Sequence, residues 1–155
     1  MAKLEVLENK KLVLKNVLVH ELRDISLDSL EDEINRFINK LDVLKVQGFG
    51  PLITKNFGTN ISDEGYLTTN YDLMIQAHDY TQYKNIYKTY DKLTAEHCVY
   101  VRFSDHPQYS NFAHDKINLH FYEKELISSD VTYSIIVEEK EELLIMDLFV
   151  PVKTL

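Results

Sequence analysis

The residue with the clearest chemical potential is a carboxylate in an apolar stretch near the end of the chain. Asp147 stands in the run LLIMDLFVPV at 143–152, whose apolar residues occupy both alternating positions and predict a strand buried on both faces. An ionised, unpaired carboxylate is costly there, so we expect Asp147 to be paired, protonated or exposed to a cleft. A carboxylate at the floor of an aromatic cleft would bind an organic cation, and the alternative is a structural ion pair, for example with Arg102. Asp72, in the earlier segment YDLMI, carries the same two interpretations.

Tyrosines are the second feature, because the chain has ten of them and no tryptophan. A tyrosine offers a broad apolar face and a polar tip, which suits a pocket wall that holds a cation. Tyr71, Tyr100 and Tyr133 fall within predicted strands, where they could alternatively just cover a sheet and fill the edge of the core. The predicted ligand-binding residues are therefore Asp147, Tyr100, Tyr71, Tyr133 and Asp72.

The sequence lacks the patterns of catalytic and metal sites. None of the six histidines forms an HExxH motif, and His114 and His120 lie six positions apart, on different faces of a predicted helix. Cys98 is the single cysteine, which excludes an internal disulfide and favours a buried, inert thiol. Neither a G-x-S-x-G elbow nor a glycine-rich phosphate loop occurs. We expect no catalytic residue, no metal and no cofactor, and hence a protein that is not an enzyme.

Composition and charge limit the class of protein. The 155 residues suit one domain spanning 1–155, and 45% hydrophobic residues suit a globular core. With 25 acidic and 17 basic residues the formal net charge is -8, which argues against a nucleic-acid partner. The start of the sequence lacks the apolar core of a signal peptide, and no 18 apolar residues run together. We therefore expect no membrane association and a cytoplasmic location.

Periodicity places the candidate residues on two similar series of elements. The first series is a strand at 12–25, a helix with an apolar stripe over 30–41, and strands at 51–57 and 66–77. The second series is a strand at 96–104, a helix beginning near Pro107, and strands at 131–139 and 143–152. We predict an α+β fold of duplicated β-α-β-β units that form an antiparallel sheet with two main helices. The internal repeat covers approximately 10–78 and 96–153, with 79–95 as the crossover.

Two stretches of sequence carry a resemblance to a known family. The segment CVYVRFSDHPQYSNF at 98–112 and the ending MDLFVPV at 146–152 resemble the gyrase-inhibitor-like domains. These are also the effector-binding domains of some AraC-type and MerR-type multidrug regulators, and the chain also resembles stand-alone bacterial proteins of this fold, mostly from Firmicutes. The resemblance implies a cleft between the two halves, lined by aromatic residues and often containing a carboxylate. In the family such clefts bind lipophilic cations, some relatives bind DNA gyrase, and a few hydrolyse strained small molecules. The tryptophans of the family's pocket are missing from this chain, as is the helix-turn-helix of the regulators.

These observations lead to one leading function and an alternative of another class. We expect a non-enzymatic small-molecule-binding domain for a lipophilic or cationic ligand in an aromatic cleft. The alternative is a protein-interaction or inhibitor protein whose partner is gyrase or a toxin from the same operon. Hydrolysis with Asp147 or Glu138 as base is the weakest option. Strands that are apolar on both faces also suggest a homodimer.

Overall fold

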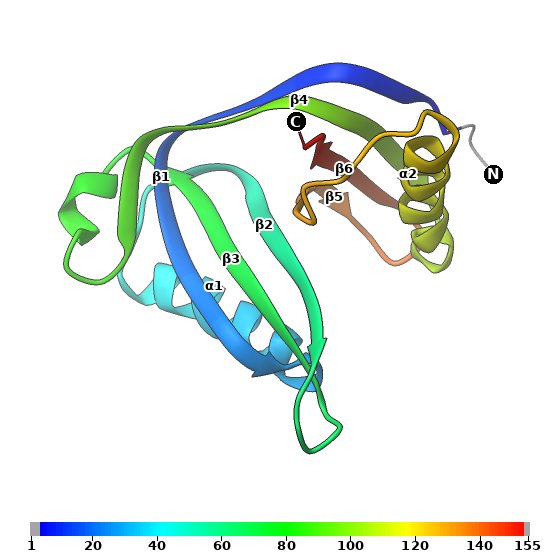
Figure 1. Ribbon diagram of the computed structural model, residues 1–155. Coiled ribbons are helices and arrows are strands. Elements are labelled where there is room, and N and C mark those ends of the chain that lie inside the picture. Colours follow the sequence, from blue (N-terminus) through cyan, green and yellow to red (C-terminus); the bar gives the residue numbers. More distant parts are fainter. Residues whose placement is uncertain (1–3, 154–155) are drawn as a thin grey trace. The chain divides into compact units, whose positions relative to one another are not determined.

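The computed structural model describes residues 4–153 and divides into two compact units. Unit 1 contains the described residues up to Val13 and those from Thr94 onward, and unit 2 is Leu14–Leu93. Two long strands, β1 (Val6–Ser26) and β4 (Lys88–Asp105), each contribute residues to both units (Figure 1). The two helices and the antiparallel pairing of the strands confirm the predicted α+β class.

Unit 2 is built around a central strand. Besides part of β1 it contains α1 (Leu30–Val43), β2 (Gly48–Ile61), β3 (Leu67–Ala77) and the 3₁₀ turns Leu27–Ser29 and Tyr80–Tyr83. Strand β3 lies between β1 and β2, so that Asp72 is paired with Glu21 on one side and Lys55 on the other. The central strand therefore holds its carboxylate between two charged neighbours.

Unit 1 follows the same order of elements. Besides parts of β1 and β4 it contains the 3₁₀ turn Pro107–Tyr109, α2 (Asn111–Glu123), β5 (Thr132–Glu139) and β6 (Leu144–Pro151). Here β6 is central, with Asp147 paired with Arg102 of β4 and with Ile135 of β5. The predicted order strand, helix, strand, strand is thus present in each unit, while its origin in a duplication and the single domain stay predictions.

The strands that begin the two series are longer than predicted. Strand β1 starts at Val6 instead of residue 12, and β4 starts at Lys88 instead of residue 96, inside the predicted crossover. The added segments, VLENKK and KTYDKLTA, are rich in charged residues and exposed side chains. Because few of these side chains are buried, they leave no apolar alternation that would have revealed the strands.

Each helix covers one face of the strands in its own unit. In unit 1, Ala113, Ile117 and Phe121 of α2 share a buried cluster with residues of β4 and β6: Val99, Val101, Phe103, Leu144, Met146, Leu148 and Val150. In unit 2, Phe37 of α1 packs with Leu18, Leu22 and Leu73. Since successive side chains on a strand point to opposite faces, the residues between these core positions face away from the helix.

No helix among the described residues is long and apolar enough to cross a membrane.

The core of unit 1 gives the first testable prediction. Phe103 is fully buried among β4, β6 and α2, so Phe103→Ala should lower the free energy of unfolding by about 3–5 kcal/mol in urea titrations. Phe112→Ala in the same unit is the matched control, because its side chain is 47% exposed and its loss should change stability little. Equal losses for the two variants would contradict the assignment of the core.

Candidate functional site

Asp147 makes three hydrogen bonds at a site that is almost closed to solvent. The residue is 8% exposed. Its Oδ1 accepts hydrogen bonds from the Tyr100 hydroxyl at 2.7 Å and from Arg102 Nε at 2.8 Å, and its Oδ2 accepts one from Arg102 Nη2 at 2.9 Å. The carboxylate and the guanidinium therefore meet in the two-pronged geometry that is strongest for this pair. The ion pair that we had considered as the structural alternative is present.

Strand register brings these three residues together. Arg102 lies directly opposite Asp147 in the β4–β6 ladder, and Tyr100, two positions earlier on β4, lies opposite Phe149. A long side chain reaches both its direct and its diagonal cross-strand neighbour, which is how the Tyr100 hydroxyl contacts Asp147. The alternation of β4 and the central position of Asp147 are sufficient to build the site.

The third strand extends this face with further apolar side chains. On β5, Tyr133 is paired with Phe149 and Ile135 with Asp147. The rings of Tyr100 and Phe149 lie 4.8 Å apart between centroids. Tyr100, Tyr133, Ile135 and Phe149 are all half-buried, and α2 packs on the opposite face of the same strands. We call this set of side chains, together with Asp147 and Arg102, the aromatic face of unit 1.

The charges of the site stabilise one another. Hydrogen bonding to Asp147 and its charge raise the pKa of the Arg102 guanidinium further above its usual range. Burial raises the pKa of Tyr100, and the hydrogen bond to Asp147 adds to the increase. The side chain of Arg102 is 53% exposed, however, so solvent screens the ion pair and its net contribution to stability is small. Arg102 is thus both well oriented and accessible.

The other two predicted site residues lie in unit 2 and face in opposite directions. Asp72 binds Arg23 through an Oδ1–Nη2 contact of 2.8 Å, and the same Nη2 contacts Glu21 at 2.8 Å. Tyr71 instead packs against the core that α1 covers, and burial raises its pKa. Because neighbouring residues on a strand alternate, the structure does not bring Tyr71 and Asp72 to one face.

Sequence reasoning assigned no role to the two phenylalanines, Phe149 and Phe57, that lie in these two charged sites. The Phe149 ring is tilted against that of Tyr100, and in unit 2 the Arg23 guanidinium lies 5.0 Å from the centroid of the Phe57 ring. Lys55 Nζ lies 4.8 Å from the same Phe57 centroid. Phe149 could have been found from the sequence, because it lies two residues after Asp147 and so faces the same side of the strand.

No group of three His, Cys, Asp or Glu side chains within residues 4–153 is arranged to hold a metal ion. Cys98 is fully buried, and burial raises the pKa of its thiol to about 11. The thiol is therefore protonated at neutral pH, as its interpretation as an inert core residue requires.

Comparison with known proteins gives a fold but no family. No family model matches the chain, and no curated protein matches its sequence. Among solved structures, an uncharacterised conserved protein from Listeria innocua is similar over 97% of this chain and 92% of its own, with 12% identity and a TM-score of 0.55. A hydrolase from Listeria innocua is similar over the same shares, with 10% identity and a TM-score of 0.51. SAV2435 bound to tetraphenylphosphonium is similar over 98% of this chain and 94% of its own, with 10% identity and a TM-score of 0.48.

The comparison corrects our expectation that the protein is not an enzyme. A hydrolase shares this fold along nearly the whole chain, so the fold does not separate binding proteins from enzymes. The two bases considered for hydrolysis are both engaged, since Asp147 accepts three hydrogen bonds and Glu138 forms an ion pair with Lys140 at 2.8 Å. Because a hydrolase shares the fold, the absence of a catalytic motif from the sequence was not enough to predict that the protein is not an enzyme.

The contact between Tyr100 and Asp147 gives the second prediction. Tyr100→Phe removes one donor from a nearly buried carboxylate and should lower the free energy of unfolding by about 1–2 kcal/mol at pH 7. Because the pKa of Tyr100 is raised, the folded protein holds this proton more tightly than the unfolded chain, and stability should fall as the pH rises above about 10. The stability of Tyr100→Phe should therefore fall less at high pH than that of the parent protein.

Tyr122→Phe serves as the control for urea titrations at pH 7 and above pH 10, since Tyr122 is 83% exposed. It should match the parent protein throughout. If Tyr100→Phe matches the parent as well, the hydroxyl contributes nothing to the site.

Proposed function

We propose that the aromatic face of unit 1 binds a small lipophilic ligand that carries a positive charge. One observation carries the proposal: Asp147 is a carboxylate with 8% exposure, surrounded by half-buried Tyr100, Tyr133 and Phe149, on the face of the strands that α2 leaves uncovered. Aromatic faces attract organic cations, and a carboxylate beneath them supplies the compensating charge.

Arg102 occupies the position of the cation when no ligand is bound. Its guanidinium forms a two-pronged ion pair with Asp147, and its exposed, solvent-screened side chain can leave at little cost. A ligand cation that replaces it preserves the charge balance of the site, while Tyr100 continues to donate to Asp147 Oδ1. Binding is therefore an exchange of one cation for another.

The remaining elements of the proposal concern unit 2, the superfamily and the location of the protein. Asp72, which Arg23 holds through one Oδ1–Nη2 contact, would anchor a ligand only by displacing a guanidinium shared with Glu21. Tyr71 would contribute only by packing against the core that α1 covers. The likeness in fold to other small α+β proteins is consistent with membership of the gyrase-inhibitor-like superfamily. The cleft between the halves, the cytoplasmic location and the lack of a nucleic-acid partner stay predictions.

A second candidate function is binding to another protein. Helix α2 exposes a series of apolar side chains: Phe112, Leu119 and Tyr122 are 47%, 50% and 83% exposed. Exposed apolar side chains that follow one helix are typical of contact surfaces. This surface supports the alternative of an interaction or inhibitor protein, whose partner would be gyrase, an operon-encoded toxin or a second copy of the chain.

The third prediction uses two ions of equal shape and opposite charge. By isothermal titration calorimetry, the protein should bind tetraphenylphosphonium but not tetraphenylborate. Asp147→Asn should weaken binding of the cation by at least about tenfold, because it removes the compensating charge. Arg102→Gln should strengthen it several-fold, because it removes the competing guanidinium.

The matched control is Asp115→Asn, which makes the same change in charge at an exposed position of α2. It should leave the affinity within about twofold of the parent, since exposed charges at a distance are screened. Equal effects of the two aspartate substitutions, or equal affinities for the two ions, would refute the proposal.

A further inference from the structure

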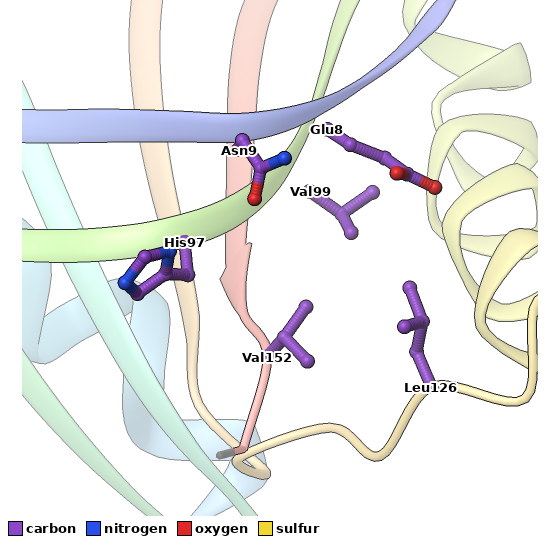
Figure 2. A pocket seen from close by; sticks show the side chains of 6 residues that line it. All are labelled: Glu8, Asn9, His97, Val99, Leu126 and Val152. Atoms are coloured by element: carbon purple, nitrogen blue, oxygen red, sulfur yellow. The ribbon is translucent and has the colours of Figure 1, made fainter.

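A pocket lies on the face of the unit 1 strands that is opposite the aromatic face. It has a volume of about 210 Å³ and is lined by residues of β1, β4 and the segments that follow α2 and β6: Glu8, Asn9, His97, Val99, Leu126 and Val152 (Figure 2). Val99 belongs to the core cluster beneath α2, whereas Tyr100, the next residue, belongs to the aromatic face. The pocket is therefore independent of the site around Asp147.

The end of helix α2 explains why this space stays open. The helix stops at Glu123, Glu125 takes a left-handed conformation with φ of 56°, and Leu126 N–H bonds back to the Phe121 carbonyl at 2.9 Å. The chain then turns away from the helix axis and pairs with the end of β6 through the bridge between Ser128 and Val152. No further helical turn covers Val99 at this end, and the core continues into an unfilled pocket.

The floor of the pocket is apolar. Val99 is 1% exposed, and Leu126 and Val152 pack against the core at partial burial. Figure 2 shows these three side chains around one space, with Asn9 reaching into it from β1. Apolar walls without a neighbour lose dispersion contacts, so they favour an apolar group in the space. At roughly 30 Å³ for a water-sized group, about seven such groups fit.

The rim of the pocket is polar and contains one carboxylate. Glu8 Oε1 contacts His120 Nε2 at 2.7 Å, whereas the second carboxylate oxygen of Glu8 makes no hydrogen bond or ion pair within residues 4–153. Across residues 4–153 the side chains of Asn9 and His97 make no hydrogen bond to another residue. The rim thus offers a carboxylate oxygen, a carboxamide and an imidazole to a ligand that can donate hydrogen bonds.

Unusual backbone geometry places two of these rim residues. Asn9 and His97 adopt left-handed conformations with φ of 54° and 56°. Residues other than glycine take this conformation at an energetic cost, and it redirects a side chain out of the regular alternation of a strand. The His97 carbonyl accepts a hydrogen bond from Val152 N–H at 3.0 Å, which ties the rim on β4 to the floor. The rim and the floor are therefore held as one structure.

We propose that this pocket binds a small primary amine with an apolar body. The ammonium group donates hydrogen bonds to the free oxygen of Glu8 and to the Asn9 carboxamide oxygen. The apolar body contacts Val99, Leu126 and Val152. The proposal does not depend on the function of the aromatic face, since no lining residue belongs to both sites.

The test compares benzylamine with benzyl alcohol, which has the same ring but no charge. In NMR titrations of the full chain, benzylamine should shift the methyl signals of Val99, Leu126 and Val152, and benzyl alcohol should bind at least about tenfold more weakly. Glu8→Gln should weaken the binding of benzylamine by a similar factor. Glu5→Gln, which makes the same change in charge near the start of β1, should not.

Two further variants separate recognition from folding. His120→Gln removes the partner of Glu8 but keeps the carboxylate, so benzylamine binding should be retained or strengthened. Val152→Phe fills the pocket and should abolish the methyl shifts in a protein that still shows dispersed signals. The proposal is overturned if benzyl alcohol binds as tightly as benzylamine, if Glu8→Gln has no effect, or if His120→Gln weakens binding as much as Glu8→Gln does. It is also overturned if benzylamine shifts no pocket methyl group.

Discussion

The contact between Arg102 and Asp147 is the interaction on which the proposed function of unit 1 depends. Asp147 occupies the central strand, where an isolated carboxylate would be strongly destabilising. The guanidinium supplies two donors and Tyr100 a third, so the charge stays at the centre of an otherwise apolar strand. Because Arg102 is half exposed, this arrangement pairs the carboxylate without locking it away from a competing cation.

Unit 2 also pairs a carboxylate on its central strand with an arginine, but the contacts of that arginine are different. Asp72 also occupies a central strand and is held by an arginine from the neighbouring strand, but Arg23 divides its contacts between Asp72 and Glu21. Arg23 further lies over Phe57, and Glu21 is bound by Lys88 at 3.0 Å. This wider network holds the arginine more firmly than the single pair in unit 1. It explains why the corresponding carboxylates are proposed to differ as ligand sites.

Sequence alone revealed the parts of the structure that depend on local pattern. A charged residue in an apolar run identified Asp147, and strand alternation is enough to place Tyr100 beside it. Tyr71 and Asp72 were grouped as site residues although neighbours on a strand face opposite ways. The pocket lined by Val99, Leu126 and Val152 has no signature in the sequence, because it depends on left-handed backbone at Asn9 and on where helix α2 ends.

The exchange of Arg102 for a ligand cation is the central claim, and the Arg102 Nε–H group reports on it directly. In the free protein this proton is hydrogen-bonded to Asp147, so its exchange with solvent, followed by NMR of arginine side chains, should be slow. Saturating tetraphenylphosphonium should release the guanidinium, and the exchange should accelerate towards that of a free arginine. A ligand that binds while the Arg102 proton stays protected would contradict the account.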